Sequence, residues 1–385
     1  MAVSVRTDIQ GLRGLGIALI VLLHAGLPGF QGGFVGVEVF FVISGYVVTV
    51  SLLRKPASQP IQNLRNFFVK RILRLMPAST LVIIATVVAA YFLLGPAFNP
   101  DLFDDARWAT VFGTNFRLID TGANYFIAGL DKSLLTHYWY LAIEQQVYLV
   151  YPLVIFIALA VLPERWRRGL PVALLLLVTV ASGWFSWQLT QTDSVAAYFS
   201  PVSRVWELTF GATLAFAPDR WFATTRRLNT VISVLALAGL LAASFLLGPQ
   251  SPYPGVLAWW PAACTAVLIL ALPNSSDFGP KGWLSLRPLA YLGDISYSLY
   301  LWHYAWLLIP AQMISPLSSP AWVAFELVGA LGCAVITHRY IEVPIRNSKT
   351  LSIDGFSTFL VLAVCVGLAL DAVLIVQNLW LANRG

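Results

Sequence analysis

Long apolar runs, each close to the length of a membrane span, restrict most strongly how this chain can fold. Of its 385 residues, 58% are hydrophobic and only 11% are charged, whereas a soluble domain carries about 25% charged residues. The mean hydropathy of +0.75 leaves too little polar surface to keep the chain in water. Because a bilayer core needs about 20 apolar residues per helix, the chain is predicted to be a polytopic membrane protein.

The runs predict an all-α transmembrane bundle of one membrane domain over residues 1–385. A ten-span core is expected over about 1–350, followed by an extra span over about 356–379, which makes about eleven spans. The predicted spans are 14–30, 34–53, 75–95, 137–162, 170–189, 200–217, 229–247, 256–272, 289–309, 321–337 and 356–379.

Basic residues predict the orientation in a cytoplasmic membrane. With the N-terminus inside, all but five of the 24 Lys and Arg residues fall in cytoplasmic segments, the five being Arg107, Arg117, Lys132, Arg204 and Arg384. This positive-inside bias predicts a cytoplasmic N-terminus and an extracytoplasmic C-terminus. The same bias accounts for the net charge of +6, so no nucleic-acid partner is implied.

His24 interrupts the first apolar run and follows Arg13 by eleven residues. Eleven residues are close to three helical turns and about 16 Å, so the two side chains share a face and His24 is expected near mid-bilayer. Ionisable groups at that depth mark functional sites by default. The alternative is a histidine that only hydrogen-bonds between helices.

Three carboxylates, Glu38, Glu144 and Glu207, fall near the outer ends of the second, fourth and sixth predicted spans. A carboxylate in lipid must be protonated or paired, so each is expected to face an internal cavity. For Glu207 the alternative is a structural ion pair with Arg204, three residues earlier.

Two further polar groups fall at the ends of predicted spans. On the ninth, Ser296, Tyr300 and His303 follow i, i+4, i+7 spacing and form one stripe, of which an aromatic belt would explain only Tyr300. A loop is predicted before the third span, and its residues Arg71 and Arg74 can hold a phosphate bidentately or anchor lipid headgroups. These features outline a polar route across the membrane, which suits a transporter or a membrane enzyme.

Seven separated motifs then make the chain resemble acyltransferase family 3, integral-membrane enzymes that O-acylate bacterial surface glycans. The resemblance covers nearly the whole chain, with small departures: Glu38 stands where Asp is common, and Glu144-Gln145 where a Glu-Glu pair is common. The motifs are RTDIQGLRG (6–14), the run around His24, GVEVFFVISGY (36–46), FVKRILRLMP (68–77), HYWYLAIEQQVYLVYP (137–152), LGDISYSLYLWH (292–303) and YIEVPIR (340–346).

The resemblance implies an acyl-coenzyme A donor, usually acetyl-CoA, bound from the cytoplasmic side. His24 occupies the position of the family's essential histidine, and Arg13 that of its N-terminal arginine. Arg71 and Arg74 match its Arg-x-x-Arg pair and, with Lys70, would hold the phosphates of coenzyme A.

Further contacts follow from the same resemblance. Gly36, Ser44 and Gly45 would let the backbone approach the pantetheine arm closely. No tightly bound cofactor, metal ion or protein partner is implied. The residues expected to contact the acceptor are Glu38, Glu144, Ser296, Tyr300 and His303.

The expected reaction moves an acyl group, acetyl by the resemblance, to a hydroxyl of a glycan or glycolipid of the cell envelope. A neutral imidazole at His24 would take the hydroxyl proton during attack on the thioester. An acyl-imidazole intermediate is the alternative route. The alternative function is a transporter or flippase that uses the same polar path without chemistry.

Overall fold

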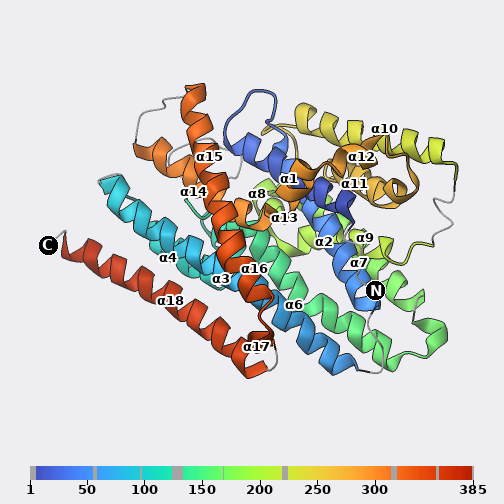
Figure 1. The fold of residues 1–385 in the computed structure, drawn as a ribbon, viewed down its shortest axis with the longest axis horizontal. Helices are drawn as coiled ribbons and strands as arrows, with labels where there is room; N and C mark the ends of the chain where they lie inside the picture. The colour runs from blue at the N-terminus through green and yellow to red at the C-terminus, as the bar shows by residue number, and fades with distance from the viewer. Residues whose placement is uncertain are drawn as a thin grey trace. The chain divides into compact units, whose positions relative to one another are not determined.

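The computed structural model describes residues 6–54, 59–95, 98–123, 133–167, 169–218, 224–313, 319–352 and 355–383. Every regular element within these ranges is a helix, as the all-α prediction requires (Figure 1). Lys132 and Arg384, used above for the orientation, lie outside the described residues. The chain divides into two compact units, Met1–Pro60 with Val147–Ser296 and Ile61–Gln146 with Tyr297–Gly385. Each unit is described separately.

The first unit is built on the N-terminal helix pair. Within it, α1 packs against α2 and α13, α9 packs against α2 and α7, and α10 packs against α11. Its helices are α1 (Thr7–His24), η1 (Gly33–Val35), α2 (Gly36–Leu53), η3 (Glu164–Trp166), α7 (Gly169–Thr192), α8 (Ser194–Phe199), α9 (Pro201–Leu214), α10 (Arg226–Leu246), α11 (Trp259–Ala271), η5 (Leu272–Asn274), α12 (Pro280–Leu284) and α13 (Arg287–Asp294).

The second unit contains the longest helix, α3. Within it, α18 packs against α4. Its helices are α3 (Pro60–Leu94), α4 (Asp101–Thr110), α5 (Thr114–Asp120), α14 (Ser296–Met313), α15 (Pro320–Thr337), the π-helix η6 (His338–Glu342), α16 (Val343–Arg346), α17 (Lys349–Ser352) and α18 (Gly355–Ala382), while α6 (Tyr138–Val161) carries residues of both units.

Eight helical segments of the described chain are long and apolar enough to cross a membrane. Every predicted span overlaps at least one helix. However, α9 and α11 contain only 14 and 13 residues, fewer than the about 20 that a bilayer core requires. Helix α14 contains 18 residues but carries many polar and aromatic side chains. The predicted count of about eleven is therefore not confirmed.

Two predicted boundaries are wrong where they bear on the site. Helix α1 ends at His24 rather than near residue 30, because Gly26 and Gly29 adopt left-handed φ angles of +66° and +85°. His24 is thus the last residue of its helix, not a mid-helix residue. Helix α3 begins at Pro60, so the predicted loop over 67–77 is instead part of a 35-residue helix.

Two glycines set a close helix crossing in the first unit, that of α2 and α9. A Cβ atom on Gly45 would lie 1.9 Å from the carbonyl oxygen of Leu208. A Cβ atom on Gly211 would lie 2.0 Å from the carbonyl oxygen of Val42. Both distances are far below contact, so α2 and α9 can cross as they do only with glycine at both positions, as is common between membrane helices.

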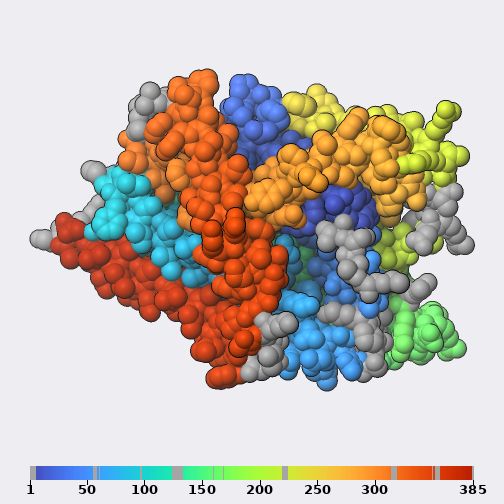
Figure 2. All heavy atoms as spheres, viewed as in Figure 1, coloured from blue at the N-terminus to red at the C-terminus, as the bar shows by residue number. Residues whose placement is uncertain are grey.

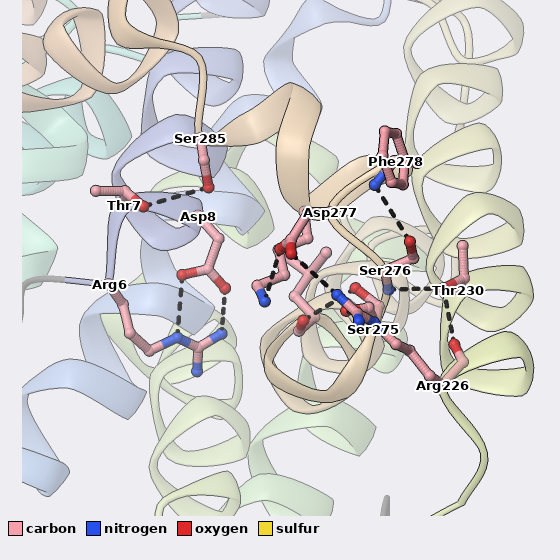
Figure 3. Close-up of polar contacts among 12 residues, drawn as sticks. Arg6, Thr7, Asp8, Arg226, Thr230, Ser275, Ser276, Asp277, Phe278 and Ser285 are labelled. Carbon is pink, nitrogen blue, oxygen red and sulfur yellow. Dashed lines mark hydrogen bonds and ion pairs between the residues drawn. The ribbon is translucent and has the colours of Figure 1, made fainter.

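Polar contacts join the start of α1 to α12 and the start of α10 to the segment after η5 (Figure 3). Thr7 Oγ1 donates to Ser285 Oγ at 3.2 Å. The guanidinium of Arg226 lies 2.9 Å from the carboxylate of Asp277, and Lys281 lies equally close. The hydrogen bond and charge of Lys281, followed by the charge of Arg226, lower the pKa of Asp277.

Helices α15 and α18 show surface along their length (Figure 2), and many of their large apolar side chains are exposed. Exposed patches of large hydrophobic side chains are expected on helices that face lipid. The exposed residues include Phe325, Val328, Leu331 and Ile336 of α15 and Phe356, Phe359, Leu360, Val364 and Leu368 of α18.

Candidate active site

The predicted site residues are divided between the two units. The first unit contains Arg13, His24, Gly36, Glu38, Ser44, Gly45 and Ser296. The second unit contains Lys70, Arg71, Arg74, Glu144, Tyr300 and His303.

Arg13 and Ser296 are in direct contact in the first unit. The Nη2 atom of Arg13 donates to Ser296 Oγ at 2.9 Å, and its Nη1 atom donates to Gln10 Oε1 at 3.3 Å. Arg13 is half-buried and Ser296 is buried. The structure therefore joins Arg13, predicted with His24 as a catalytic residue, to a residue predicted to contact the acceptor.

His24 lies at the carboxyl end of α1 and is half-buried. The unpaired carbonyl groups at this end of a helix carry partial negative charge. A positive charge on the imidazole is stabilised there, so the position suits a group that accepts a proton during a reaction. The sequence predicted the shared helix of Arg13 and His24, and both residues do lie on α1.

Glu38 is fully buried in an ion-pair cluster with Arg204 and Glu207. Arg204 Nη2 lies 2.8 Å from Glu38 Oε1, and Arg204 Nη1 lies 2.9 Å from Glu207 Oε1, with none of the three side chains exposed. The prediction placed Glu38 and Glu207 against an internal cavity, whereas both carboxylates are fully buried against the guanidinium of Arg204. The alternative ion pair between Arg204 and Glu207 is confirmed.

Aromatic rings enclose this cluster. The guanidinium carbon of Arg204 lies 5.2 Å from the ring centre of Tyr198, 5.6 Å from that of Phe41 and 5.9 Å from that of Tyr253. These distances lie within the range of cation–π attraction. One guanidinium thus pairs with carboxylates from two helices inside an aromatic shell.

The glycines predicted to approach the donor instead approach neighbouring helices. A Cβ atom on Gly36 would lie 2.3 Å from the carbonyl oxygen of Gly16 in α1. The corresponding space at Gly45 is occupied by the backbone of α9. At both glycines the backbone that approaches closely is therefore that of a neighbouring helix. Ser44, between them in sequence, is half-buried.

Arg71 is held by two neighbouring side chains of α6. Its Nη2 atom lies 3.0 Å from Glu144 Oε2, and its Nε atom donates to Gln145 Oε1 at 3.3 Å. Tyr140 also donates to Glu144, at 3.3 Å. The prediction placed Glu144 with the acceptor, but the structure places it with a residue predicted for the donor.

Arg74, one turn along α3, faces a different carboxylate. Its Nε atom lies 3.9 Å from Glu342 Oε1, and its side chain is 31% exposed. Lys70 is exposed on the same helix. The two arginines of the Arg-x-x-Arg pair therefore have separate acidic partners.

Tyr300 and His303 lie in a buried cluster with His137. The hydroxyl of Tyr300 donates to the carbonyl oxygen of His137 at 2.6 Å, and the rings of His137 and His303 lie 5.4 Å apart. The Nδ1 atom of His303 lies 2.7 Å from the carbonyl oxygen of Tyr300 and must carry the hydrogen, because a carbonyl only accepts. All three side chains are buried.

Two side chains of these clusters were missed as site residues in the sequence: His137 and Glu342. Each lies in a motif that supported the family resemblance, within HYWYLAIEQQVYLVYP or YIEVPIR. The signal was therefore present, but no periodicity connected these residues to the predicted donor or acceptor groups.

The family model for an acyltransferase domain, acyltransferase family 3, matches residues 6–339. The peptidoglycan O-acetyltransferase OatA of Listeria monocytogenes is 29% identical over 361 residues, covering 89% of this chain and 56% of that protein. The O-acetyltransferase OatA of Staphylococcus aureus is 30% identical over 365 residues, covering 91% of this chain and 58% of that protein.

The chain thus spans a little over half the length of these curated relatives. No solved structure matches it. The family match extends over most of the chain and includes α1, α3 and α6, which carry Arg13, His24, Arg71 and Glu144. The chain is a multi-pass membrane protein and belongs to acyltransferase family 3.

Proposed function

We propose that this chain moves an acyl group, acetyl in the first instance, from acyl-coenzyme A to a hydroxyl of a cell-envelope glycan. The observation that carries the proposal is the family match over residues 6–339. The two relatives named as O-acetyltransferases support acetyl as the group and ester formation as the reaction. The name of the Listeria relative, a peptidoglycan O-acetyltransferase, makes peptidoglycan the first acceptor to test.

The donor enters from the cytoplasm in this proposal. The positive-inside bias of the sequence supports a cytoplasmic N-terminus and, with it, a cytoplasmic position for the basic part of α3. Coenzyme A carries several phosphates, and Arg71 and Arg74 supply guanidiniums on that part of the chain. The acceptor meets the acyl group nearer the outer face.

His24 acts as the general base. Its imidazole takes the proton of the acceptor hydroxyl while the hydroxyl oxygen attacks the thioester carbonyl carbon. The carbon–sulfur bond breaks, and the thiolate of coenzyme A leaves and takes the proton from the imidazolium, which returns His24 to its neutral form. The carboxyl end of α1 stabilises the imidazolium formed in this step. Arg13, which is fixed by Ser296 and lies on the same helix, is a positioning residue.

The test is the ester content of the envelope. Cells that carry the gene should yield glycan fragments with acetyl groups that mild base releases, detected as a mass difference. Cells that lack the gene, or that carry His24→Ala at equal membrane level, should lose these groups. Unchanged acetylation in the strain without the gene would reject the proposal.

A further inference from the structure

The carboxylate of Glu342 is the centre of a polar cluster in the second unit. Its Oε2 atom accepts from Ser298 Oγ at 3.1 Å and lies 3.0 Å from His338 Nδ1. Its Oε1 atom lies 3.4 Å from Arg346 Nη1 and 3.9 Å from Arg74 Nε. The carboxylate is buried, so it holds side chains from α3, α14 and α16 around one fixed point.

The local helix geometry explains why these groups meet. His338, Glu342 and Arg346 follow one another at intervals of four residues, which brings their side chains to one face. Residues His338–Glu342 form a π-helix, an arrangement that often occurs at functional sites. The sequence motif YIEVPIR therefore contributes both a buried carboxylate and a guanidinium beside it.

Positive charge exceeds negative charge in this cluster. The charged groups that act on Arg74 include Arg71, Arg346, Glu342 and Glu144. Three guanidiniums thus stand with two carboxylates, which leaves one positive charge that these five side chains do not neutralise. Like charges close together are costly, and an anion bound among them removes that cost.

The two arginines beside Glu342 have hydrogen-bond donors to spare. Arg74 makes no hydrogen bond within the described ranges, since its nearest carboxylate oxygen is 3.9 Å away. Arg346 makes one long bond, at 3.4 Å. A guanidinium carries five N–H donors, and these side chains are 31% and 36% exposed. By contrast, Arg71 already donates to Gln145 and pairs with Glu144.

We propose that Arg74 and Arg346, held together by Glu342, form a phosphate site, and that the phosphate belongs to the acyl-coenzyme A donor. Two guanidinium forks suit the oxygens of a phosphate group. The inference rests on the proposed function and changes the expected clamp, because Arg346 replaces Arg71 as the partner of Arg74. A phospholipid headgroup offers the same chemistry and is the alternative source of the phosphate.

The experiment measures binding of coenzyme A by calorimetry to the full chain in phosphatidylcholine nanodiscs. Arg346→Gln should weaken binding about tenfold or more, because charge-assisted hydrogen bonds are lost. Arg346→Lys keeps the charge but not the fork and should also weaken it, by several-fold. Arg339→Gln is the matched control: Arg339 is exposed near the end of the same helical segment, with its guanidinium 5.7 Å from the ring centre of Tyr340. It should bind like the wild type.

Each outcome has a defined meaning. Equal affinity of the wild type, Arg346→Gln and Arg346→Lys would overturn the proposed site, while the proposed function would stand if the wild type binds coenzyme A. A wild type that does not bind coenzyme A would reject the proposed function itself. Loss of co-purifying phosphatidylglycerol from Arg346→Gln, with coenzyme A binding unchanged, would assign the site to lipid and overturn the assignment to the donor. If Arg346→Gln unfolds, Arg346→Lys decides.

Discussion

The Nη2 atom of Arg71 lies 3.0 Å from the Oε2 atom of Glu144. The two side chains are 16% and 9% exposed, so the pair is largely removed from water. Glu144 is therefore a positioning residue for a guanidinium of α3, and the Glu144-Gln145 step of α6 holds Arg71 from both sides.

A double-mutant cycle on Arg71→Gln and Glu144→Gln measures this relationship. Each single change should lower the free energy of unfolding, and the double change should cost less than the sum of the two. We expect a coupling energy of about 0.5–3 kcal/mol, the range for contacting residues. If the two changes have additive effects on the free energy of unfolding, and Glu144→Gln impairs only the use of the acceptor, Glu144 contacts the acceptor as the sequence predicted.

Arg204 should be essential for folding. Arg204→Met leaves the carboxylates of Glu38 and Glu207 buried without a cation, which should destabilise the protein by about 3–5 kcal/mol. The variant that combines this change with Glu38→Gln and Glu207→Gln should recover much of that loss, because no buried charge remains. The measurement is the melting temperature of purified protein in detergent.

The control for Arg204 is an exposed ion pair in the same unit. Arg226 and Asp277 are 62% and 65% exposed, and such pairs contribute little. Arg226→Gln should leave the melting temperature unchanged. An unchanged melting temperature of Arg204→Met would mean that the buried cluster contributes little to the stability of the fold.

Gly45→Ala separates a packing role from a donor-binding role. The added methyl group would meet Leu208 O at 1.9 Å, so the amount of folded protein should fall sharply. Gly332→Ala is the matched control in α15: nothing lies within 4 Å of its added methyl group, so the fold should be retained. Folded Gly45→Ala protein with a raised KM for acetyl-CoA would instead support contact with the donor.

Much of the fold could be predicted from the sequence because apolar runs report directly on helices. Helix ends were harder to predict, because they are set by glycines with left-handed φ angles, such as Gly26, and not by hydropathy. The basic start of α3 was predicted as a loop because its polar side chains interrupt the apolar run, although they leave the helix intact. Hydropathy therefore located the elements but not their ends.

The candidate site was predicted in part. Arg13 and His24 lie on one helix because their spacing is local, and Arg204 pairs with Glu207 for the same reason. The contact of Arg204 with Glu38 joins residues 166 positions apart, and no periodicity encodes such a distance. The partners of Arg71 and Arg74 were missed for the same physical reason.

The most direct test of the account is acetyl transfer in sealed, inverted membrane vesicles. Labelled acetyl-CoA added outside should transfer its acetyl group to a glycan acceptor trapped in the lumen, and the product should release the label in mild base. Vesicles with His24→Ala at equal protein level should form no labelled ester. Equal labelling by His24→Ala vesicles, or no labelling by wild-type vesicles that are shown to be sealed and to contain acceptor, would contradict the account.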